Sequence, residues 1–310
     1  MNRRRFLERC PPALLAGGLV TRQLVTAAPV TVAPGVAAPA AGSSTLRKAV
    51  CIGALPKEIS VLERFELARR MGIEGVEPNT LNTPEEVREY KEAAERTGLK
   101  IHSIMNSDHW KYPLTDNDPE VVRLCMEGVR TSLRNAHELG ADAVLLVPGI
   151  VTATVGYGQV WERSQARIRE LIPMAEDLGV ILAVENVGNR FLLSPLEFAR
   201  YVDDFGSPWV RAYFDVGNVT SIGFPPDWIR TLGKRLCKIH IKKFEPGVDH
   251  PVFDPQDRRT QGIDWPGVRQ ALAEVGYSGW VSAEVRSGPP EYLQELSARI
   301  DRIFEGQNPY

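Results

Sequence analysis

The 310-residue chain has few cysteines, and their spacing fits no metal or disulfide motif. Its four cysteines are Cys10, Cys51, Cys125 and Cys237, with no Cys-x-x-Cys or Cys-x-His pair among them. Zinc sites built on cysteine use such closely spaced pairs, so no cysteine zinc site is expected. We interpret the three cysteines after residue 44 as small buried apolar residues, a common environment for free cysteine.

A surplus of positive charge is also missing. The chain has 37 Lys and Arg against 39 Asp and Glu, a formal net charge of −2. Proteins that hold a nucleic-acid backbone usually carry a basic excess, so no nucleic-acid partner is expected. The turn after the first predicted strand, Gly53-Ala54-Leu55-Pro56-Lys57, is neither a Gly-x-Gly-x-x-Gly nor a Walker A phosphate motif.

No apolar run reaches the roughly 20 residues that a membrane-spanning helix needs. The N-terminus, Asn2-Arg3-Arg4-Arg5-Phe6-Leu7 followed by a short apolar stretch, is similar to a twin-arginine export signal. Ala38-Pro39-Ala40 fits a small-residue cleavage pattern. We therefore expect residues 1–44 to be an export signal with an Ala/Pro-rich linker, 45–310 to be one domain, and the mature protein to be periplasmic. An uncleaved basic tail is the alternative.

From Lys48 onward, short apolar runs alternate with longer, charged stretches of helical period. Such runs are typical of buried parallel strands, and the stretches between them of amphipathic helices. The predicted strands are 49–54, 75–77, 100–105, 143–147, 181–185, 210–215, 237–241 and 280–284. The predicted helices are 59–71, 84–97, 119–139, 157–178, 195–204, 226–232, 265–275 and 290–304. This order predicts a single-domain (β/α)₈ TIM barrel, with an open doubly wound sheet as the alternative.

The last four predicted strands each bring an acidic residue or a histidine to the same end of the barrel. These residues are Glu185, Asp215, His240 and Glu284. Each taken singly is more often a cap, an ion-pair partner or a core histidine. Three carboxylates and an imidazole that converge at the active-site end would repel one another unless a cation binds among them. The set therefore predicts a metal site, and its oxygen-rich chemistry suits Mn²⁺, Mg²⁺ or Co²⁺ better than a structural Zn²⁺.

These motifs resemble the sugar isomerases and epimerases of the xylose-isomerase-like TIM-barrel superfamily, which include the D-tagatose 3-epimerases and hydroxypyruvate isomerases. The resemblance covers roughly residues 48–305 and rests on four segments: Val184-Glu185-Asn186, Phe214-Asp215-Val216-Gly217-Asn218, Ile239-His240-Ile241-Lys242, and Gly276-Tyr277-Ser278-Gly279-Trp280 ahead of Glu284. It implies one divalent ion, Mn²⁺ above Mg²⁺, Co²⁺ or Zn²⁺. It also implies that Glu185 and Glu284 act as the acid–base pair, moving a proton next to a carbonyl through an enediolate.

Five further residues are expected to contact a carbohydrate substrate: Lys242, Glu77, His102, Asn218 and Asn186. Lys242 lies two residues after His240 and therefore on the same side of its strand. A salt bridge to a site carboxylate is the alternative for Lys242, and cap or core roles are the alternatives for Glu77 and His102. Asn186 could fix the geometry of Glu185. The loop after the third strand adds aromatic candidates for stacking on a sugar: His109, Trp110 and Tyr112.

Two positions depart from the sugar epimerases. Asn218 stands where they often have a histidine, and Lys242-Lys243-Phe244 replaces a stretch in which they tend to have an arginine. We expect a sugar or polyol epimerase or aldose–ketose isomerase. A lyase or dehydratase using the same proton abstraction, and a non-catalytic sugar-binding barrel, are the alternatives. An export signal would favour an unphosphorylated substrate, and the resemblance implies a homo-oligomer.

Overall fold

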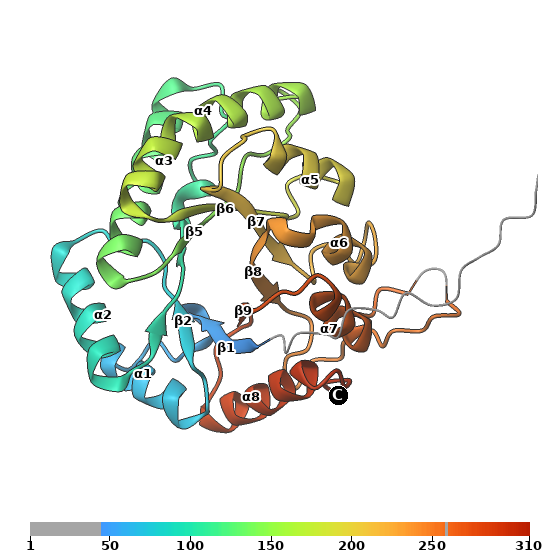
Figure 1. Ribbon diagram of the computed structural model, residues 1–310. Helices are drawn as coiled ribbons and strands as arrows, with labels where there is room; N and C mark the ends of the chain where they lie inside the picture. Colours follow the sequence, from blue (N-terminus) through green and yellow to red (C-terminus); the bar gives the residue numbers. More distant parts are fainter. Residues whose placement is uncertain (1–44, 258–259) are drawn as a thin grey trace, which may run out of the picture. The chain divides into compact units, whose positions relative to one another are not determined.

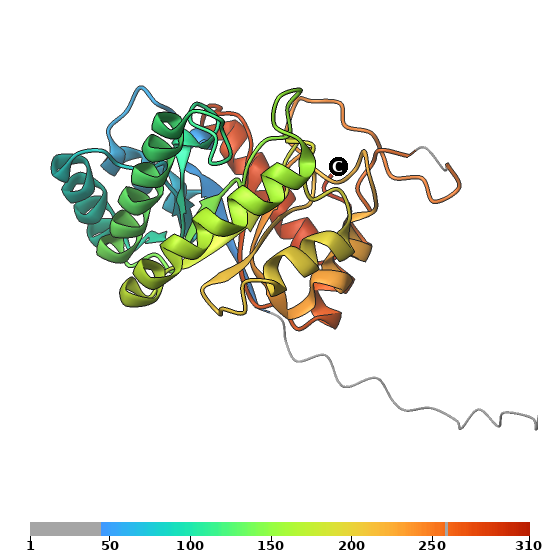
Figure 2. The ribbon, with the colours of Figure 1, turned by 90° about the horizontal axis from the view of Figure 1, so that it is seen from above.

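The strands form one parallel sheet that curves into a barrel, with helices on its outside (Figures 1 and 2). The computed structural model describes residues 45–257 and 260–310. The strand order is β3-β2-β1-β9-β8-β7-β6-β5-β4. The two ends of this order, β3 (Lys100–Ile101) and β4 (Ile104–Met105), are halves of the third predicted strand, interrupted at His102 and Ser103. The barrel is therefore nearly closed, which confirms the predicted TIM-like class.

The remaining strands follow the predicted runs closely. They are β1 (Leu46–Cys51), β2 (Gly75–Glu77), β5 (Ala143–Leu146), β6 (Ile181–Glu185), β7 (Val210–Asp215), β8 (Leu236–Ile241) and β9 (Gly279–Ala283). The first strand begins and ends earlier than predicted, at Leu46–Cys51 instead of 49–54. It begins at Leu46, because residues 46–50 pair with β9 despite their charges, and it gives way to a 3-10 turn at Ile52–Ala54.

Eight α-helices lie between and after the described strands. They are α1 (Val61–Arg70), α2 (Pro84–Thr97), α3 (Pro119–Leu139), α4 (Tyr157–Leu178), α5 (Pro195–Asp203), α6 (Pro225–Leu232), α7 (Trp265–Glu274) and α8 (Pro290–Phe304). Capping explains the sharp helix starts: Ser60 and Thr83 each form a capping box with a glutamate three residues later. In the part of the chain that the structure describes, none of the helices is both long and apolar enough to span a bilayer. The predicted export signal lies outside the described residues.

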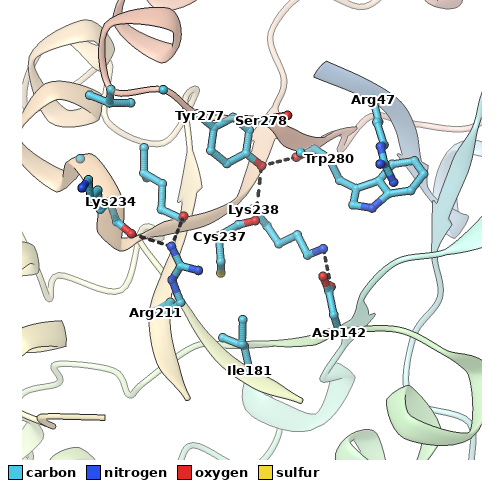
Figure 3. A pocket seen from close by; sticks show the side chains of 15 residues that line it. Arg47, Asp142, Ile181, Arg211, Lys234, Cys237, Lys238, Tyr277, Ser278 and Trp280 are labelled. Carbon is cyan, nitrogen blue, oxygen red and sulfur yellow. Dashed lines mark hydrogen bonds and ion pairs between the residues drawn. The ribbon is translucent and has the colours of Figure 1, made fainter. Parts of the chain in front are cut away.

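A cavity of about 710 Å³ opens at the end of the barrel where the strands begin (Figure 3). Two of its cationic side chains already have partners. Arg211 donates to the backbone oxygens of Lys234 and Leu236, and Lys238 pairs with Asp142 at 2.5 Å. Catalytic residues of TIM barrels come from the opposite strand ends, so the candidate site lies at the other end of the barrel.

Candidate active site

Four side chains from successive strands meet where those strands end. Glu185 ends β6, Asp215 ends β7, His240 is the penultimate residue of β8, and Glu284 directly follows β9. The strand register brings them level, because Asp215 pairs with His240 and the Glu284 amide donates to the Ile241 carbonyl oxygen at 2.9 Å. One potential ligand atom from each residue lies within 4.8 Å of the others. The four predicted residues are therefore brought together.

Contacts inside this cluster place one nitrogen among carboxylate oxygens. His240 Nδ1 lies 3.3 Å from Glu185 Oε1 and 3.9 Å from Glu284 Oε2. Lys242 Nζ lies 3.0 Å from Asp215 Oδ2 and 2.5 Å from Glu284 Oε2. The salt bridge that was the alternative for Lys242 is thus present. Its ammonium therefore offsets part of the negative charge of the cluster.

The two glutamates have opposite pKa shifts. Burial raises the pKa of Glu185 to about 7, with Asp215 and Glu284 adding to the rise, while His240 opposes it. Burial would also raise the pKa of Glu284, but the charges of His240 and Lys242 lower it below its ordinary value. Pairs of carboxyl groups whose environments separate their pKa values in this way are typical of acid–base sites.

The donor set fits a divalent metal ion. Asp215 is fully buried and Glu185 nearly so, and buried carboxylates in close contact are costly unless a cation lies among them. Carboxylate oxygens with one imidazole nitrogen suit hard or borderline divalent ions. The residues that could hold such an ion are Glu185, Asp215, His240 and Glu284.

Asn186 and Asn218 link the ends of β6 and β7 through their side chains. Asn186 accepts from the Asp215 amide and donates to the Asp215 carbonyl oxygen, both at 2.9 Å. Asn218 donates to the Asn186 carbonyl oxygen at 2.9 Å and accepts from Lys242 at 3.2 Å. Gly217 leaves room for this lysine, since a Cβ there would collide with Lys242 Cγ. Both amides are thus used within the protein, and their predicted contact with substrate stays a prediction.

Glu77 and His102 lie deeper in the barrel. Glu77 is fully buried and its Oε2 lies 2.7 Å from His240 Nε2. His102 Nε2 lies 2.9 Å from Ser282 Oγ, and its ring stacks on Trp280 at 4.8 Å. Burial, aided by Lys238, lowers the pKa of His102 to about 3, so its imidazole is neutral. These contacts are within the protein core, and the predicted contact of Glu77 and His102 with substrate stays a prediction.

Two further groups contact Glu77 and His240, and neither was assigned a role at the site from sequence. The hydroxyl of Tyr213 donates to Glu77 at 3.0 Å, and the thiol of Cys51 lies 3.5 Å from His240 Nε2. Strand alternation could have indicated that Cys51 and Tyr213 face inward, but not which groups they meet.

His109, predicted only as an aromatic candidate, lies on the loop after β4. Its side chain is buried, its Nδ1 has no hydrogen-bond partner among the described residues, and Glu284 is the charged group that acts on it. Burial lowers the pKa of His109 to about 4, against the opposing effect of Glu284. Trp110 beside it is 52% exposed. A neutral imidazole with free hydrogen-bonding capacity therefore lies near the site.

Comparison with known proteins identifies the family. Residues 65–303 match the xylose isomerase-like TIM barrel family. The chain belongs to this family. Among curated proteins, it is 26% identical over 237 residues to L-ribulose-5-phosphate 3-epimerase UlaE of Escherichia coli O1:K1, covering 73% of this chain and 82% of that protein.

Solved structures of sugar epimerases share the fold. L-ribulose 3-epimerase has a TM-score of 0.69 at 16% identity, covering 84% of this chain and 95% of its own. The D-allulose 3-epimerase of a Methylomonas species, in complex with D-allulose, has a TM-score of 0.64 at 18% identity, covering 86% of this chain and 92% of its own. At these identities the structures establish the fold. The relatives and neighbours are epimerases, a class of isomerase, in agreement with the expected enzyme class.

Proposed function

We propose that this protein is a divalent-metal-dependent sugar epimerase that moves a proton next to the carbonyl of a ketose. The observation that carries the proposal is the convergence of Glu185, Asp215, His240 and Glu284 within 4.8 Å at the strand ends. The similarity to L-ribulose-5-phosphate 3-epimerase, although only 26% identical, supports the same reaction class. No observation favours the lyase alternative.

When bound by the four side chains, a divalent ion would polarise the substrate carbonyl and stabilise the charge of an enediolate. The protein's own part is to move the proton. Glu284, whose pKa is lowered, is ionised at neutral pH and can accept the proton from carbon. Glu185, the more buried of the two glutamates, is the group proposed to return a proton to the enediolate. In the reverse direction the two glutamates exchange roles.

Lys242 supplies the remaining positive charge. Its ammonium lies 2.5 Å from Glu284 Oε2 and 3.2 Å from Asn218 Oδ1, so it is held beside the proposed base. From this position it can neutralise negative charge that develops on a substrate oxygen. Asn218 fixes the lysine and thus contributes to the reaction through it.

The substrate could be a sugar phosphate or a free sugar, and the two choices are supported by different observations. The E. coli relative is named for a sugar phosphate, whereas the proposed export of this chain favours a free sugar. We propose an unphosphorylated ketose or polyol, resting on the twin-arginine-like N-terminus. A direct comparison of L-ribulose with L-ribulose 5-phosphate tests this choice.

The test is proton exchange measured by NMR. The full-length protein, loaded with Mn²⁺, Mg²⁺, Co²⁺ or Zn²⁺ and then freed of excess ion, is incubated in D₂O with L-ribulose, D-allulose, D-fructose and L-ribulose 5-phosphate. We expect deuterium at the carbon next to the carbonyl, together with the epimer, and loss of both after chelation. Loss of water from the sugar would replace the proposal with a dehydratase. Absence of exchange with every sugar and ion would refute it.

A further inference from the structure

The imidazole of His240 presents its two nitrogens to two different groups. Nδ1 faces the ligand cluster, 3.3 Å from Glu185 Oε1. Nε2 lies 2.7 Å from Glu77 Oε2. A neutral imidazole carries one N–H donor and one lone-pair acceptor, so the partner of one nitrogen decides the state of the other. The group that meets Nε2 therefore controls whether Nδ1 can be a ligand.

Glu77 meets Nε2 as an acceptor in a closed pocket of donors. It ends β2, and its side chain has no exposed surface. Besides His240, its Oε2 accepts from the Tyr213 hydroxyl at 3.0 Å and from the Cys51 thiol at 3.6 Å. A buried carboxylate is thus fixed against the imidazole by short contacts from both sides.

The neighbours that share this pocket stay neutral. Burial raises the pKa of the Cys51 thiol to about 12 and that of the Tyr213 hydroxyl well above its usual value. Both can therefore donate to Glu77 but do not compete with it as anions. Register also holds the arrangement, because Cys51 and Glu77 are paired residues on adjacent strands.

We propose that Glu77 is a positioning residue that holds His240 with its proton on Nε2, so that the Nδ1 lone pair is directed at the ligand cluster. The proposal rests on the metal site of the proposed function. It assigns Glu77 to the metal centre rather than to substrate. Carboxylates that accept from a ligating histidine typically change metal affinity about 10- to 100-fold when they are removed.

The alternative is an ion held by a second group, because Cys51, Glu77 and His240 also form a compact set of potential ligands. An ion bound there would be coordinated by His240 Nε2, which would replace the hydrogen bond between Nε2 and Glu77. It would also need Cys51 as a thiolate. The contact between His240 Nε2 and Glu77 Oε2, at 2.7 Å, is a hydrogen-bond distance and is shorter than the 3.5 Å between Nε2 and Cys51 Sγ. These contacts favour the positioning role, and Cys51→Ser distinguishes the two.

The experiment measures Mn²⁺ affinity by calorimetry in the full-length protein. Glu77→Leu removes the acceptor, and Glu77→Gln keeps a neutral acceptor of the same length. Glu74→Gln, on an exposed residue three positions earlier, is the matched control. We expect Mn²⁺ binding to weaken about 100-fold in Glu77→Leu and about 10-fold in Glu77→Gln, with the control unchanged. Circular dichroism of the metal-free variants shows whether each is folded.

Graded recovery by Gln is the result that a purely structural role would not produce. If Glu77→Leu fails to fold, Glu77→Gln alone decides the matter. Folded Glu77 variants that bind Mn²⁺ as the wild type does would overturn the inference. Loss of binding in Cys51→Ser would also overturn it, by placing the ion in the other group. If wild-type protein binds none of Mn²⁺, Mg²⁺, Co²⁺ or Zn²⁺, the proposed function fails, and this inference with it.

Discussion

Replacement of Lys242 by methionine should have opposite effects on the metal-free and the metal-loaded protein. The ammonium lies 3.0 Å from Asp215 Oδ2 and 2.5 Å from Glu284 Oε2. Asp215 Oδ1 already accepts a hydrogen bond from the backbone N–H of Asn218 at 2.7 Å, so Oδ2 is the oxygen left for a cation. The lysine and a divalent ion therefore compete for the same oxygens. Lys242→Met removes one competitor and leaves a methionine of similar length.

The magnitude follows from burial. Removing one partner of a buried ion pair costs about 3–5 kcal/mol, whereas exposed pairs contribute about 0–1 kcal/mol. Asp215 has no exposed side-chain surface, and Glu284 is 38% exposed. We therefore expect Lys242→Met to lower the free energy of unfolding of the metal-free protein by about 2–3 kcal/mol. If a bound ion relieves the same repulsion, Mn²⁺ binding should tighten about 30- to 100-fold, at about 1.4 kcal/mol per tenfold.

Urea unfolding of the chelated protein and Mn²⁺ calorimetry measure the two effects. Lys243→Met is the control, because it removes the same charge from the next residue, whose ammonium contacts Thr220 Oγ1 at 2.5 Å. The reasoning is refuted if Lys242→Met leaves metal-free stability unchanged or weakens Mn²⁺ binding. A similar response in the Lys243 control would show that net charge alone is responsible.

Three further substitutions test the acid–base pair, the loop histidine and the barrel interior. Glu284→Gln should slow deuterium exchange at least about 100-fold at saturating Mn²⁺, and exchange at the wild-type rate would remove it as the base. His109→Ala should raise the ketose KM about 10-fold, the loss of roughly one hydrogen bond, without changing Mn²⁺ affinity; an unchanged KM would exclude substrate contact. Gly75→Ala places a Cβ 2.5 Å from the Trp280 ring and should cost about 1–3 kcal/mol in urea unfolding, whereas Gly53→Ala, with open space around it, should cost far less.

Strand prediction succeeded where an apolar run ends in a charged residue. The predicted bounds of β6 and β7 equal the observed ones, because Glu185 and Asp215 stop runs that are otherwise buried. It was less accurate where polar residues lie inside the sheet. Pairing with β9 extends β1 to Leu46, so the strand includes the charged residues Arg47 and Lys48. His102 interrupts the third strand, which local pattern shows as continuous.

Sequence order and alternation were enough to predict that four candidate ligands converge, because adjacent parallel strands bring their C-terminal ends together. They could not predict what faces His240 from across the barrel. Glu77 belongs to β2, which is separated from β8 by β1 and β9 in the sheet, and only closure of the barrel brings it within 2.7 Å of Nε2.

The amino-acid sequence by itself determined the barrel class, most strand and helix bounds, and the four candidate ligands, since each depends on local periodicity or on the order of elements. The tertiary structure decided which polar groups act on those ligands. In the folded barrel the side-chain amides of Asn186 and Asn218 form hydrogen bonds within the protein. Lys242 lies between the carboxylates of Asp215 and Glu284, and Glu77 contacts the imidazole of His240. Such contacts depend on the height and direction of side chains inside a curved sheet, and local sequence carries neither.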